Sequence, residues 1–482
     1  MLLRFRSGWE MLDAAGSSKE GARLPPRRRR AALAMIHPDA IRAYDIRGVV
    51  GRHLTAPAMR RLGLSYSALA RQRGLRGIAV GRDGRESSAD FEQALAAGLA
   101  EGGMAVTCIG LGPTPMLTFA VRELSLDGGV MVTASHNPPG ENGVKLLLGD
   151  ERIYGEALQR LVALEGQATP GGSMRHVDIT APYLDALSAA AAGSRPMTVA
   201  WDCGNGATGP MVEALTRRLP GRHVLLHTEV DGRFPNHHPD PAVENNLADL
   251  KAAVLAERCD VGFAFDGDGD RLGVVASTGR VVWSDQLLLL LAEDLLARRP
   301  GAAIVGDVKC SRVLFDGVAA RGGRAVMAPS GYVLVREAIR AEGALLGGEL
   351  SGHIFFANDW HGVDDALFAA LQTLAAVSSS GRSLDDFLNA LPPSAATPEM
   401  RIACAQPREL VRRTAERLAG TGVQVDDRLG LRVNRPDGWW LLRASGTEAK
   451  ITCRCEAADA AGLARIQAEL FAELRASGLE PG

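Results

Sequence analysis

The chain has 482 residues and is nearly neutral, with 54 basic against 56 acidic side chains. Because domains average about 150 residues, this length predicts three or four domains. The balanced charge gives no support for nucleic acid or an anionic membrane as a partner, and no uninterrupted apolar run reaches the ~18 residues of a membrane-spanning helix, so we expect neither partner.

Residues 1–35 differ in composition from the rest of the chain. They carry four consecutive arginines after two prolines, with little hydrophobic periodicity and no apolar run of signal-peptide length. We interpret them as a basic, disordered extension, or as an upstream start before a true start at Met35. The seven cysteines are scattered and form no disulfide framework, and reduced thiols favour the cytoplasm.

Strand-like and helix-like segments alternate through most of the chain, which is typical of an α/β protein. The clearest strands are expected at 77–81, 105–111, 129–132, 197–201, 261–265 and 303–308, with further short strands before Arg443. The clearest helices are expected at 88–101, near Tyr183, at 287–296 and at 407–418. Breaks in composition predict domains at 36–175, 176–277, 278–393 and 394–482.

Three aspartates alternate with glycine after the strand expected at 261–265. Alternation places Asp266, Asp268 and Asp270 on one side of an extended segment, and the glycines let the backbone curl until the oxygens converge. Such hard oxygen ligands suit magnesium. We expect a surface-facing metal loop that binds Mg²⁺.

Two other interpretations of these aspartates are an EF-hand and an acidic turn without metal. An EF-hand would need glycine and glutamate where Arg271 and Ser277 stand, so that interpretation fails. An acidic turn without metal stays open, but carboxylates at the end of a buried strand are costly without a cation.

A lone serine lies in a second polar turn, Thr133-Ala134-Ser135-His136-Asn137-Pro138, directly after the strand at 129–132. One hydroxyl and a magnesium-type carboxylate cluster in the same chain indicate phosphoryl transfer through a serine.

Two further polar segments suit a sugar phosphate. The segment 347–353 alternates Glu, Ser and His between glycines, and a carboxylate with a hydroxyl can bind sugar hydroxyls. The segment 443–447 combines a guanidinium, two hydroxyls and a glycine, as phosphate recognition requires. Each segment alone could equally be a satisfied turn.

These motifs occur in the order typical of the α-D-phosphohexomutase family, and the chain closely resembles its bacterial phosphomannomutase/phosphoglucomutase branch. The resemblance covers roughly residues 36–456. The matching segments are Tyr44-Asp45-Ile46-Arg47-Gly48, the Ser135 turn, Phe234 to Pro241, Asp266 to Arg271, Glu349 to His353, and Arg443 to Thr447.

The resemblance implies four domains around a central cleft, three mixed α/β layered domains and a small C-terminal α+β domain. It implies an isomerase that interconverts hexose 1-phosphate and hexose 6-phosphate, of mannose, glucose or both. Ser135 would carry the phosphoryl group, Mg²⁺ would be bound by Ser135 and the three aspartates, and a hexose 1,6-bisphosphate would be intermediate and activator. We expect hexose phosphates as partners and a monomer or weak homo-oligomer.

The resemblance also implies roles for residues around the metal loop. Lys145 and His136 are alternative proton carriers beside Ser135, with Arg47 and Arg271 as electrostatic partners, and His136 could equally bond the backbone of its turn. The expected substrate contacts are Tyr44, Lys309, Tyr332, Glu349, Ser351, His353, Arg443, Ser445, Gly446 and Thr447.

Two positions depart from the family's pattern. The family usually shows Gly-His where this chain has Gly331-Tyr332, and a tyrosine can donate a hydrogen bond but cannot be cationic. Lys450 lies where the branch commonly has a proline, and it resembles glucose-specific relatives. The choice between mannose and glucose therefore stays open.

Three other functions stay open beside the hexose mutase. A phosphoglucosamine mutase would share the fold and Ser135, although Leu350 and the segment 234–241 favour the hexose branch. A phosphoserine-dependent sugar phosphatase would need no bisphosphate. A non-catalytic sugar-phosphate sensor should have lost Ser135 or an aspartate, and this chain has lost neither.

Overall fold

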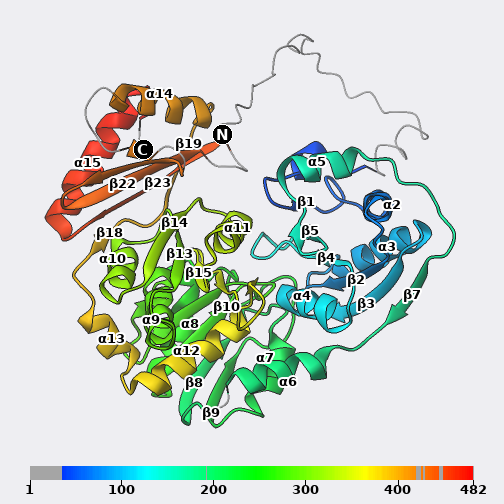
Figure 1. The fold of residues 1–482 in the computed structure, drawn as a ribbon, viewed down its shortest axis with the longest axis horizontal. Coiled ribbons are helices and arrows are strands. Elements are labelled where there is room, and N and C mark those ends of the chain that lie inside the picture. The colour runs from blue at the N-terminus through cyan, green and yellow to red at the C-terminus, as the bar shows by residue number, and fades with distance from the viewer. Residues whose placement is uncertain (1–34, 192, 420–424, 427–428, 445–448, 481–482) are drawn as a thin grey trace.

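The computed structural model describes residues 35–191, 193–419, 425–426, 429–444 and 449–480. The predicted extension at 1–35 lies outside the described residues apart from Met35, and so do Ser445, Gly446 and Thr447. Within the described part, the chain forms four sheets with their helices, which follow one another from blue to red around the molecule (Figure 1). The three mixed α/β units and the smaller α+β unit at the C-terminus are confirmed.

The first unit contains a mixed sheet in the order β1-β5-β4-β2-β3-β7, with β6 paired to β5. β2, β3 and β4 are parallel, whereas β5 returns antiparallel to β4. Its predicted strands and helix are confirmed to within one residue. The strands are β1 (Ile46–Val49), β2 (Gly77–Arg82), β3 (Ala105–Leu111), β4 (Gly128–Val132), β5 (Glu141–Leu148), β6 (Glu151–Arg152) and β7 (Ser173–His176). The helices are η1 (Pro38–Ala40), α2 (Ala56–Gln72), α3 (Ser88–Glu101), α4 (Thr114–Glu123) and α5 (Gly155–Ala163).

The second unit contains a sheet in the order β12-β11-β10-β8-β9. β12 lies beyond the border expected at 277 and pairs with β11, so the sheet extends further along the chain than the composition suggests. The strands are β8 (Met197–Asp202), β9 (Gly221–Leu226), β10 (Val261–Phe265), β11 (Leu272–Ala276) and β12 (Val281–Val282). The helices are α6 (Thr180–Ala190), α7 (Gly209–Thr216), η2 (Glu244–Leu247) and α8 (Ala248–Ala256).

The third unit contains a sheet in the order β14-β13-β15-β16-β17. The strands are β13 (Ala303–Asp307), β14 (Arg324–Ala328), β15 (Leu346–Gly348), β16 (Ile354–Phe356) and β17 (Val363–Asp364). The helices are α9 (Ser284–Arg298), α10 (Arg312–Ala320), α11 (Tyr332–Glu342), α12 (Ala366–Ser380) and α13 (Leu384–Ala390).

The fourth unit contains a sheet in the order β18-β23-β22-β21-β20, with β19 paired to β23. Both of its helices pack on β22. The strands are β18 (Ala395–Ala396), β19 (Met400–Ala403), β20 (Val425–Asp426), β21 (Leu431–Arg435), β22 (Gly438–Ala444) and β23 (Lys450–Ala457), and the helices are α14 (Pro407–Ala419) and α15 (Ala460–Ala476).

One continuous apolar core joins the first three units. It contains Leu117 of α4, Trp201 of β8, Leu288 of α9 and Leu367 of α12, all at most 1% exposed. α12 connects the third unit to the second, because it packs against α9, α6 and β11, and α4 of the first unit packs against α6 and β17. The fourth unit has a separate core around Trp440. Burial of this shared apolar surface therefore fixes the first three units relative to one another.

Other expectations concern the whole chain. The seven cysteines are all buried and unpaired. None of the described helices combines the length and apolar character that crossing a membrane requires.

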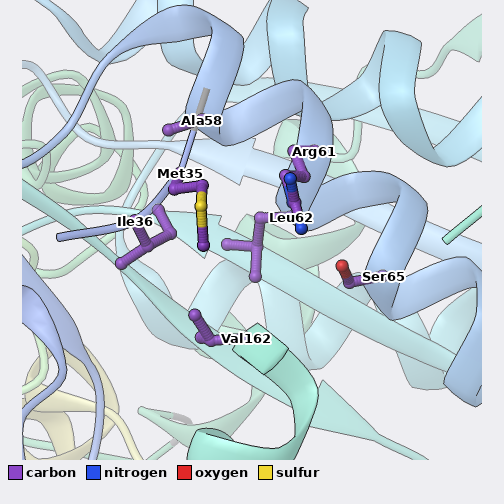
Figure 2. Close-up of a pocket in the computed structure, with 7 residues that line it drawn as sticks. All are labelled: Met35, Ile36, Ala58, Arg61, Leu62, Ser65 and Val162. Atoms are coloured by element: carbon purple, nitrogen blue, oxygen red, sulfur yellow. The ribbon is translucent and has the colours of Figure 1, made fainter. Parts of the chain in front are cut away.

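Met35 and Ile36 close a small apolar hollow between α2 and α5 (Figure 2). Its volume is about 10 Å³, which admits about one water molecule and no sugar phosphate.

Candidate active site

Ser135 lies in the turn between β4 and β5 of the first unit. Its φ of 53° is in the left-handed region, which few residues other than glycine adopt. Its backbone N–H donates to Thr133 Oγ1 at 2.8 Å, which stabilises the turn. The residue is 1% exposed, so the turn holds one hydroxyl in a fixed, buried position.

A buried arginine that the sequence analysis missed holds this turn. The guanidinium of Arg85 donates to the carbonyl oxygens of Ser135, Asn137, Pro138 and Glu141 at 2.8, 2.6, 2.8 and 2.9 Å. Arg85 comes shortly after β2, the strand beside β4 in the sheet. A polar run directly after a buried strand is the same signal that identified Ser135, and it could have identified Arg85 as well.

Arg47 contacts the same turn from β1. Its guanidinium donates to Ala134 O at 3.2 Å and to Asn137 Oδ1 at 2.8 Å, and it pairs with Asp45 at 2.8 Å. The structure therefore places Arg47 against the backbone and side chains of the Ser135 turn.

The three aspartates of the metal loop follow β10 in a tight turn. One oxygen of each lies within 4.8 Å of the others, so the predicted convergence is confirmed. Gly269 has a φ of 72°, and a Cβ there would lie 2.5 Å from Thr208 Cγ2, so the turn requires glycine. Asp266, Asp268 and Asp270 are 0, 0 and 1% exposed.

The expectation that the metal loop faces the surface is wrong, because two other units cover it. From the first unit, the Thr114 N–H donates to Asp268 O at 2.7 Å and its hydroxyl donates to Asp268 Oδ2 at 2.5 Å. From the third unit, the Ala366 N–H donates to Gly269 O at 3.2 Å.

The Ser135 hydroxyl connects the Ser135 turn to the metal loop. It donates to Asp266 Oδ2 at 2.6 Å, and its oxygen lies 3.0 Å from His136 Nδ1. Burial, with the charges of Asp268 and Asp270, raises the pKa of Asp266 well above its ordinary value. Burial, followed by the charges of Arg271 and Arg47, lowers the pKa of His136, so its imidazole is neutral.

Lys145 pairs with the metal loop from β5. Its ammonium contacts Asp268 Oδ2 at 2.6 Å and also binds Asp270 Oδ2. Burial alone would lower the pKa of Lys145, but the two carboxylates raise it overall. Burial raises and Lys145 lowers the pKa of Asp268, with a net fall below its ordinary value. Lys145 is therefore an ammonium in this arrangement.

The oxygen set fits a hard cation. Asp268 Oδ1 and Asp270 Oδ1 are buried without a hydrogen-bond partner, and unpaired carboxylate oxygens are costly inside a protein. With the Ser135 hydroxyl and Asp266 they form an oxygen-only donor set of the kind magnesium prefers. The loop is therefore a candidate metal site.

Arg271 and His353 connect the metal loop to the third unit. Arg271 Nε donates to His353 Nε2 at 3.2 Å, and His353 Nδ1 lies 3.0 Å from Asp364 Oδ2 and 3.7 Å from Asp270 Oδ1. The imidazole stacks on Tyr332 with ring centroids 5.5 Å apart. His353 is 4% exposed, so the structure places it against the metal loop.

The segment 347–353, which is predicted to bind sugar hydroxyls, contacts the backbone at Gly331, beside Tyr44 of the first unit. Glu349 accepts the Gly331 N–H through Oε1 and the Ser351 hydroxyl through Oε2, the latter at 3.1 Å. Tyr44 donates to Ser330 O at 3.2 Å. Gly331 has a φ of 131°, and a Cβ there would lie 2.5 Å from the Tyr44 hydroxyl oxygen. Glycine is therefore required here.

The departure at Tyr332 produces a buried aromatic contact. Tyr332 is 8% exposed and begins α11, and the Lys145 ammonium lies 5.8 Å from the centre of its ring. Burial raises its pKa, so the phenol is neutral and adds no charge to the site.

The remaining predicted contacts lie where the third and fourth units meet. Lys309 Nζ is 3.1 Å from Glu399 Oε2 and 3.8 Å from Asp307 Oδ2. Arg443 lies in β22, one residue before its end, and its charge offsets part of the rise that burial causes in the pKa of Tyr44. Ser445, Gly446 and Thr447 lie outside the described residues.

The sheet architecture and this site define a phosphosugar mutase of four domains. Models of the phosphoglucomutase/phosphomannomutase family match residues 39–164 as α/β/α domain I, 181–279 as domain II, 283–395 as domain III and 399–473 as the C-terminal domain. The chain belongs to this family.

Relatives match over nearly the whole chain. It is 41% identical over 443 residues to a phosphomannomutase/phosphoglucomutase of Pseudomonas aeruginosa, which covers 90% of this chain and 95% of that protein. It is 40% identical over 446 residues to a phosphoglucomutase of Neisseria gonorrhoeae, with 90% and 96% covered. The crystal structure of a phosphoglucomutase/phosphomannomutase family protein from Burkholderia thailandensis superposes with a TM-score of 0.86 at 38% identity, covering 92% of this chain and 98% of that one.

Proposed function

We propose that this protein is a phosphohexomutase that interconverts the 1- and 6-phosphates of mannose and glucose. A phosphorylated Ser135 and a hexose 1,6-bisphosphate intermediate carry the reaction. The observation that supports this most directly is the buried Ser135 hydroxyl, 2.6 Å from Asp266 within a cluster of three carboxylates. The curated relatives named above support the isomerase activity.

Mg²⁺ held by Ser135, Asp266, Asp268 and Asp270 would supply positive charge to the transferring phosphoryl group. The protein itself contributes fixed positions. Arg85 and Arg47 hold the Ser135 turn, and Arg271 lies beside the metal loop. The reacting serine and the charged groups around it are therefore positioned before the reaction, as phosphoryl transfer between two oxygens requires.

His136 is best placed to exchange a proton with Ser135. In the forward step the bond between phosphorus and the Ser135 oxygen breaks, a bond to the sugar oxygen forms, and the sugar hydroxyl proton ends on Ser135. His136 Nδ1 lies 3.0 Å from the Ser135 oxygen and the ring is neutral. Lys145 is bound to two carboxylates, so we assign it charge balance rather than proton transfer.

The substrate is held by groups from the third and fourth units. Glu349 and Ser351 would bind ring hydroxyls, and Arg443 with Lys309 would bind the phosphate that is not transferred. Ser445, Gly446 and Thr447 complete this phosphate site by the family resemblance. We assign Tyr44, Tyr332 and His353 to the substrate contacts as well.

Substrate choice depends on which sugar hydroxyls the site contacts. Glu349 and Ser351 must bind the sugar in two orientations, so they suit the central C3 and C4 hydroxyls. Mannose and glucose differ at C2, and a site rejects an analogue strongly only when a buried polar group is left unpaired. We therefore propose activity on both sugars and weak activity on glucosamine phosphate.

A coupled assay with the 1-phosphates of mannose, glucose and glucosamine tests the proposal. We expect mannose and glucose kcat/KM values within a hundredfold of each other, which corresponds to about 2.7 kcal/mol. A larger ratio contradicts the proposal that the site does not distinguish the two sugars at C2. A preference for glucosamine 1-phosphate favours the phosphoglucosamine mutase. Stoichiometric release of inorganic phosphate without bisphosphate favours the phosphatase.

We also propose a cytoplasmic enzyme that is a monomer or a weak homo-oligomer. Seven buried cysteines without a disulfide support a reducing compartment. Sedimentation at several concentrations tests the oligomeric state.

A further inference from the structure

A second cluster of metal-binding side chain types lies in the second unit, outside the residues assigned to the active site. Asp202 ends β8, and His227 and His237 lie between β9 and η2. One ligand atom from each lies within 4.8 Å of the others. The Asp202 side chain is fully buried, whereas those of His227 and His237 are 17% and 14% exposed. The cluster is therefore largely buried yet reachable from the surface.

The hydrogen bonds of His237 leave one ring nitrogen facing a carboxylate. His237 Nδ1 lies 3.1 Å from His238 O, and since a carbonyl only accepts, Nδ1 carries the proton. The Nε2 lone pair of the neutral ring then faces both oxygens of Asp202, at 3.1 and 3.0 Å. Either a second proton or a cation must lie between these groups.

His227 favours the cation. Its ring meets that of His237 with centroids 5.3 Å apart, so a second imidazole lies beside the pair formed by His237 and Asp202. Its Nε2 lies 3.1 Å from Asp249 Oδ2, so Nε2–H donates to the carboxylate and Nδ1 keeps its lone pair. Pairing of a carboxylate with a histidine in this way is typical of metal-binding histidines. His227 also holds a φ of 52°, a costly conformation for this residue.

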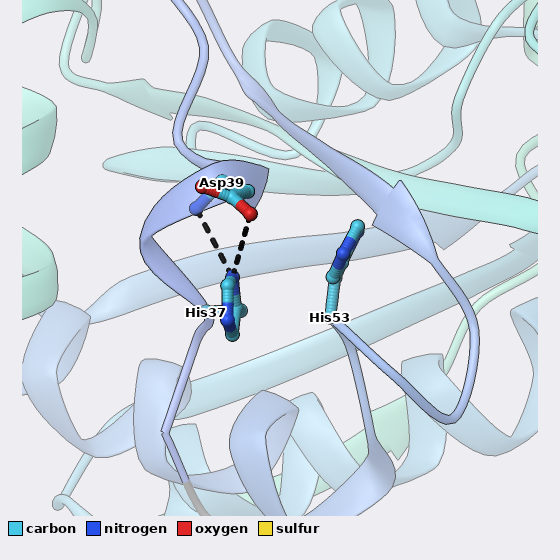
Figure 3. A group of neighbouring side chains, drawn as sticks. All are labelled: His37, Asp39 and His53. Atoms are coloured by element: carbon cyan, nitrogen blue, oxygen red, sulfur yellow. Dashed lines mark hydrogen bonds and ion pairs between the residues drawn. The ribbon is translucent and has the colours of Figure 1, made fainter. Parts of the chain in front are cut away.

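The exposed histidine cluster near the start of the described chain lacks this arrangement. His37 and His53 stack beside Asp39 (Figure 3). His37 Nδ1 accepts from the Asp39 N–H and His53 Nδ1 accepts from the Val49 N–H, both at 3.2 Å. The neutral rings therefore carry their protons on Nε2 and offer no lone pair, and the group is mostly exposed.

We propose that Asp202, His227 and His237 bind a zinc ion, with water as the fourth ligand. Two imidazole nitrogens and one carboxylate oxygen match the ligands and tetrahedral coordination of zinc, whereas magnesium prefers oxygen alone. This site differs in ligand chemistry from the oxygen-only loop at Asp266 to Asp270, so the two sites select different ions.

The zinc ion has a structural role beside the active site. Asp202 Oδ1 accepts the Gly204 N–H at 3.0 Å, at the start of the turn that precedes α7. In the same turn the Ala207 N–H donates to Gly267 O at 3.0 Å, within the metal loop. Zinc bound to Asp202 therefore holds the turn on which the backbone of the metal loop rests.

Zinc titration of the metal-stripped full chain in excess Mg²⁺ tests the proposal, because Mg²⁺ occupies the oxygen-only loop. The variant is His227→Gln, and the matched control is His176→Gln on the exposed strand β7. We expect one zinc ion per chain in wild type and control, and at least about a tenfold weaker affinity in His227→Gln. Equal zinc affinity in all three proteins, or no zinc binding by the wild type, overturns the site.

X-ray absorption on the zinc-loaded wild-type protein keeps the test independent of variant folding. A shell of nitrogen and oxygen with two imidazoles supports the site. A sulfur shell assigns the ion to cysteine, and an all-oxygen shell assigns it to the metal loop, and either result overturns the proposal. Amide exchange at residues 266–270 should slow when zinc is added, and an unchanged rate overturns the structural role.

Discussion

Replacing Arg85 by lysine tests whether the Ser135 turn depends on a single buried side chain. The guanidinium donates to four carbonyl oxygens of the turn, all within 2.9 Å. Lysine keeps the charge next to Asp83, but one ammonium has three donors on one atom and cannot span the same four acceptors. We expect it to reach about two of them.

The size of the effect follows from the bonds that are lost. Two buried carbonyls without a donor cost about 1–2 kcal/mol each, or about 2–4 kcal/mol together. Because 1.36 kcal/mol is tenfold in an equilibrium constant, the turn should open about 30- to 900-fold more often. A displaced Ser135 hydroxyl is also misaligned with the reacting sugar oxygen, so we expect kcat/KM to fall about a hundredfold.

Two measurements check this prediction. Amide exchange at Asn137 and Glu141, whose N–H groups bond within the turn, reports its opening. Steady-state kinetics report the loss of activity. The matched control is Arg82→Lys. Arg82 lies at the end of β2, three residues before Arg85, and its guanidinium pairs with Glu92 of α3 at 3.1 Å rather than with the Ser135 turn. If Arg85→Lys retained kcat/KM within twofold and showed wild-type exchange, the turn would not depend on Arg85.

Three further predictions concern the site and its surroundings. Ser135→Ala should lower turnover by several orders of magnitude, and mass analysis of the active protein should find one phosphate on the peptide that contains Ser135; phosphate elsewhere refutes the assignment. Asp268→Asn should weaken Mg²⁺ binding and activity by at least about tenfold, since it removes charge from a three-carboxylate site; full activity in excess chelator refutes the metal requirement. Burial raises the pKa of Glu399, but Lys309 and Arg401 bring it down to about 2, against 4.5 for the free group. The folded pKa is the lower one, so this stabilisation is present above pH 4.5, fades as the pH falls towards 2, and amounts to about 3 kcal/mol. The difference in unfolding free energy between wild type and Glu399→Gln should therefore shrink on acidification, and a constant difference contradicts the role of the ion pair.

The sequence identified the residues whose chemistry is visible in a short segment. Ser135 and the three aspartates each follow a buried strand, and the edge where strands end is where side chains of one sheet can meet. Their closeness to each other was expected from their joint chemistry and from the family resemblance, not from a local pattern. The 2.6 Å contact between Ser135 and Asp266 depends on two different sheets, which no local pattern encodes.

Other features were missed because their causes lie far along the chain. The metal loop is buried since Thr114 and Ala366 cover it, and each lies about a hundred residues away or more along the chain. The polar run after β2 marks Arg85 as a candidate, but its partners are backbone carbonyls, which leave no trace in the residue types of the turn it holds. The core shared by the first three units likewise depends on how α12 packs against α6, and on how α4 packs against α6 and β17.

The joints between units differ in kind, and this bears on how a sugar phosphate enters and turns. The first three units share one apolar core, which resists relative motion. The fourth meets the third through a small apolar cluster that includes Val308 and Trp439, and through polar contacts such as Lys309 with Glu399. Such an interface is closer to a transient one than to a core. Arg443 lies on the fourth unit, so the phosphate contact that we propose for it would be carried by the part that can separate most easily from the serine and the metal loop.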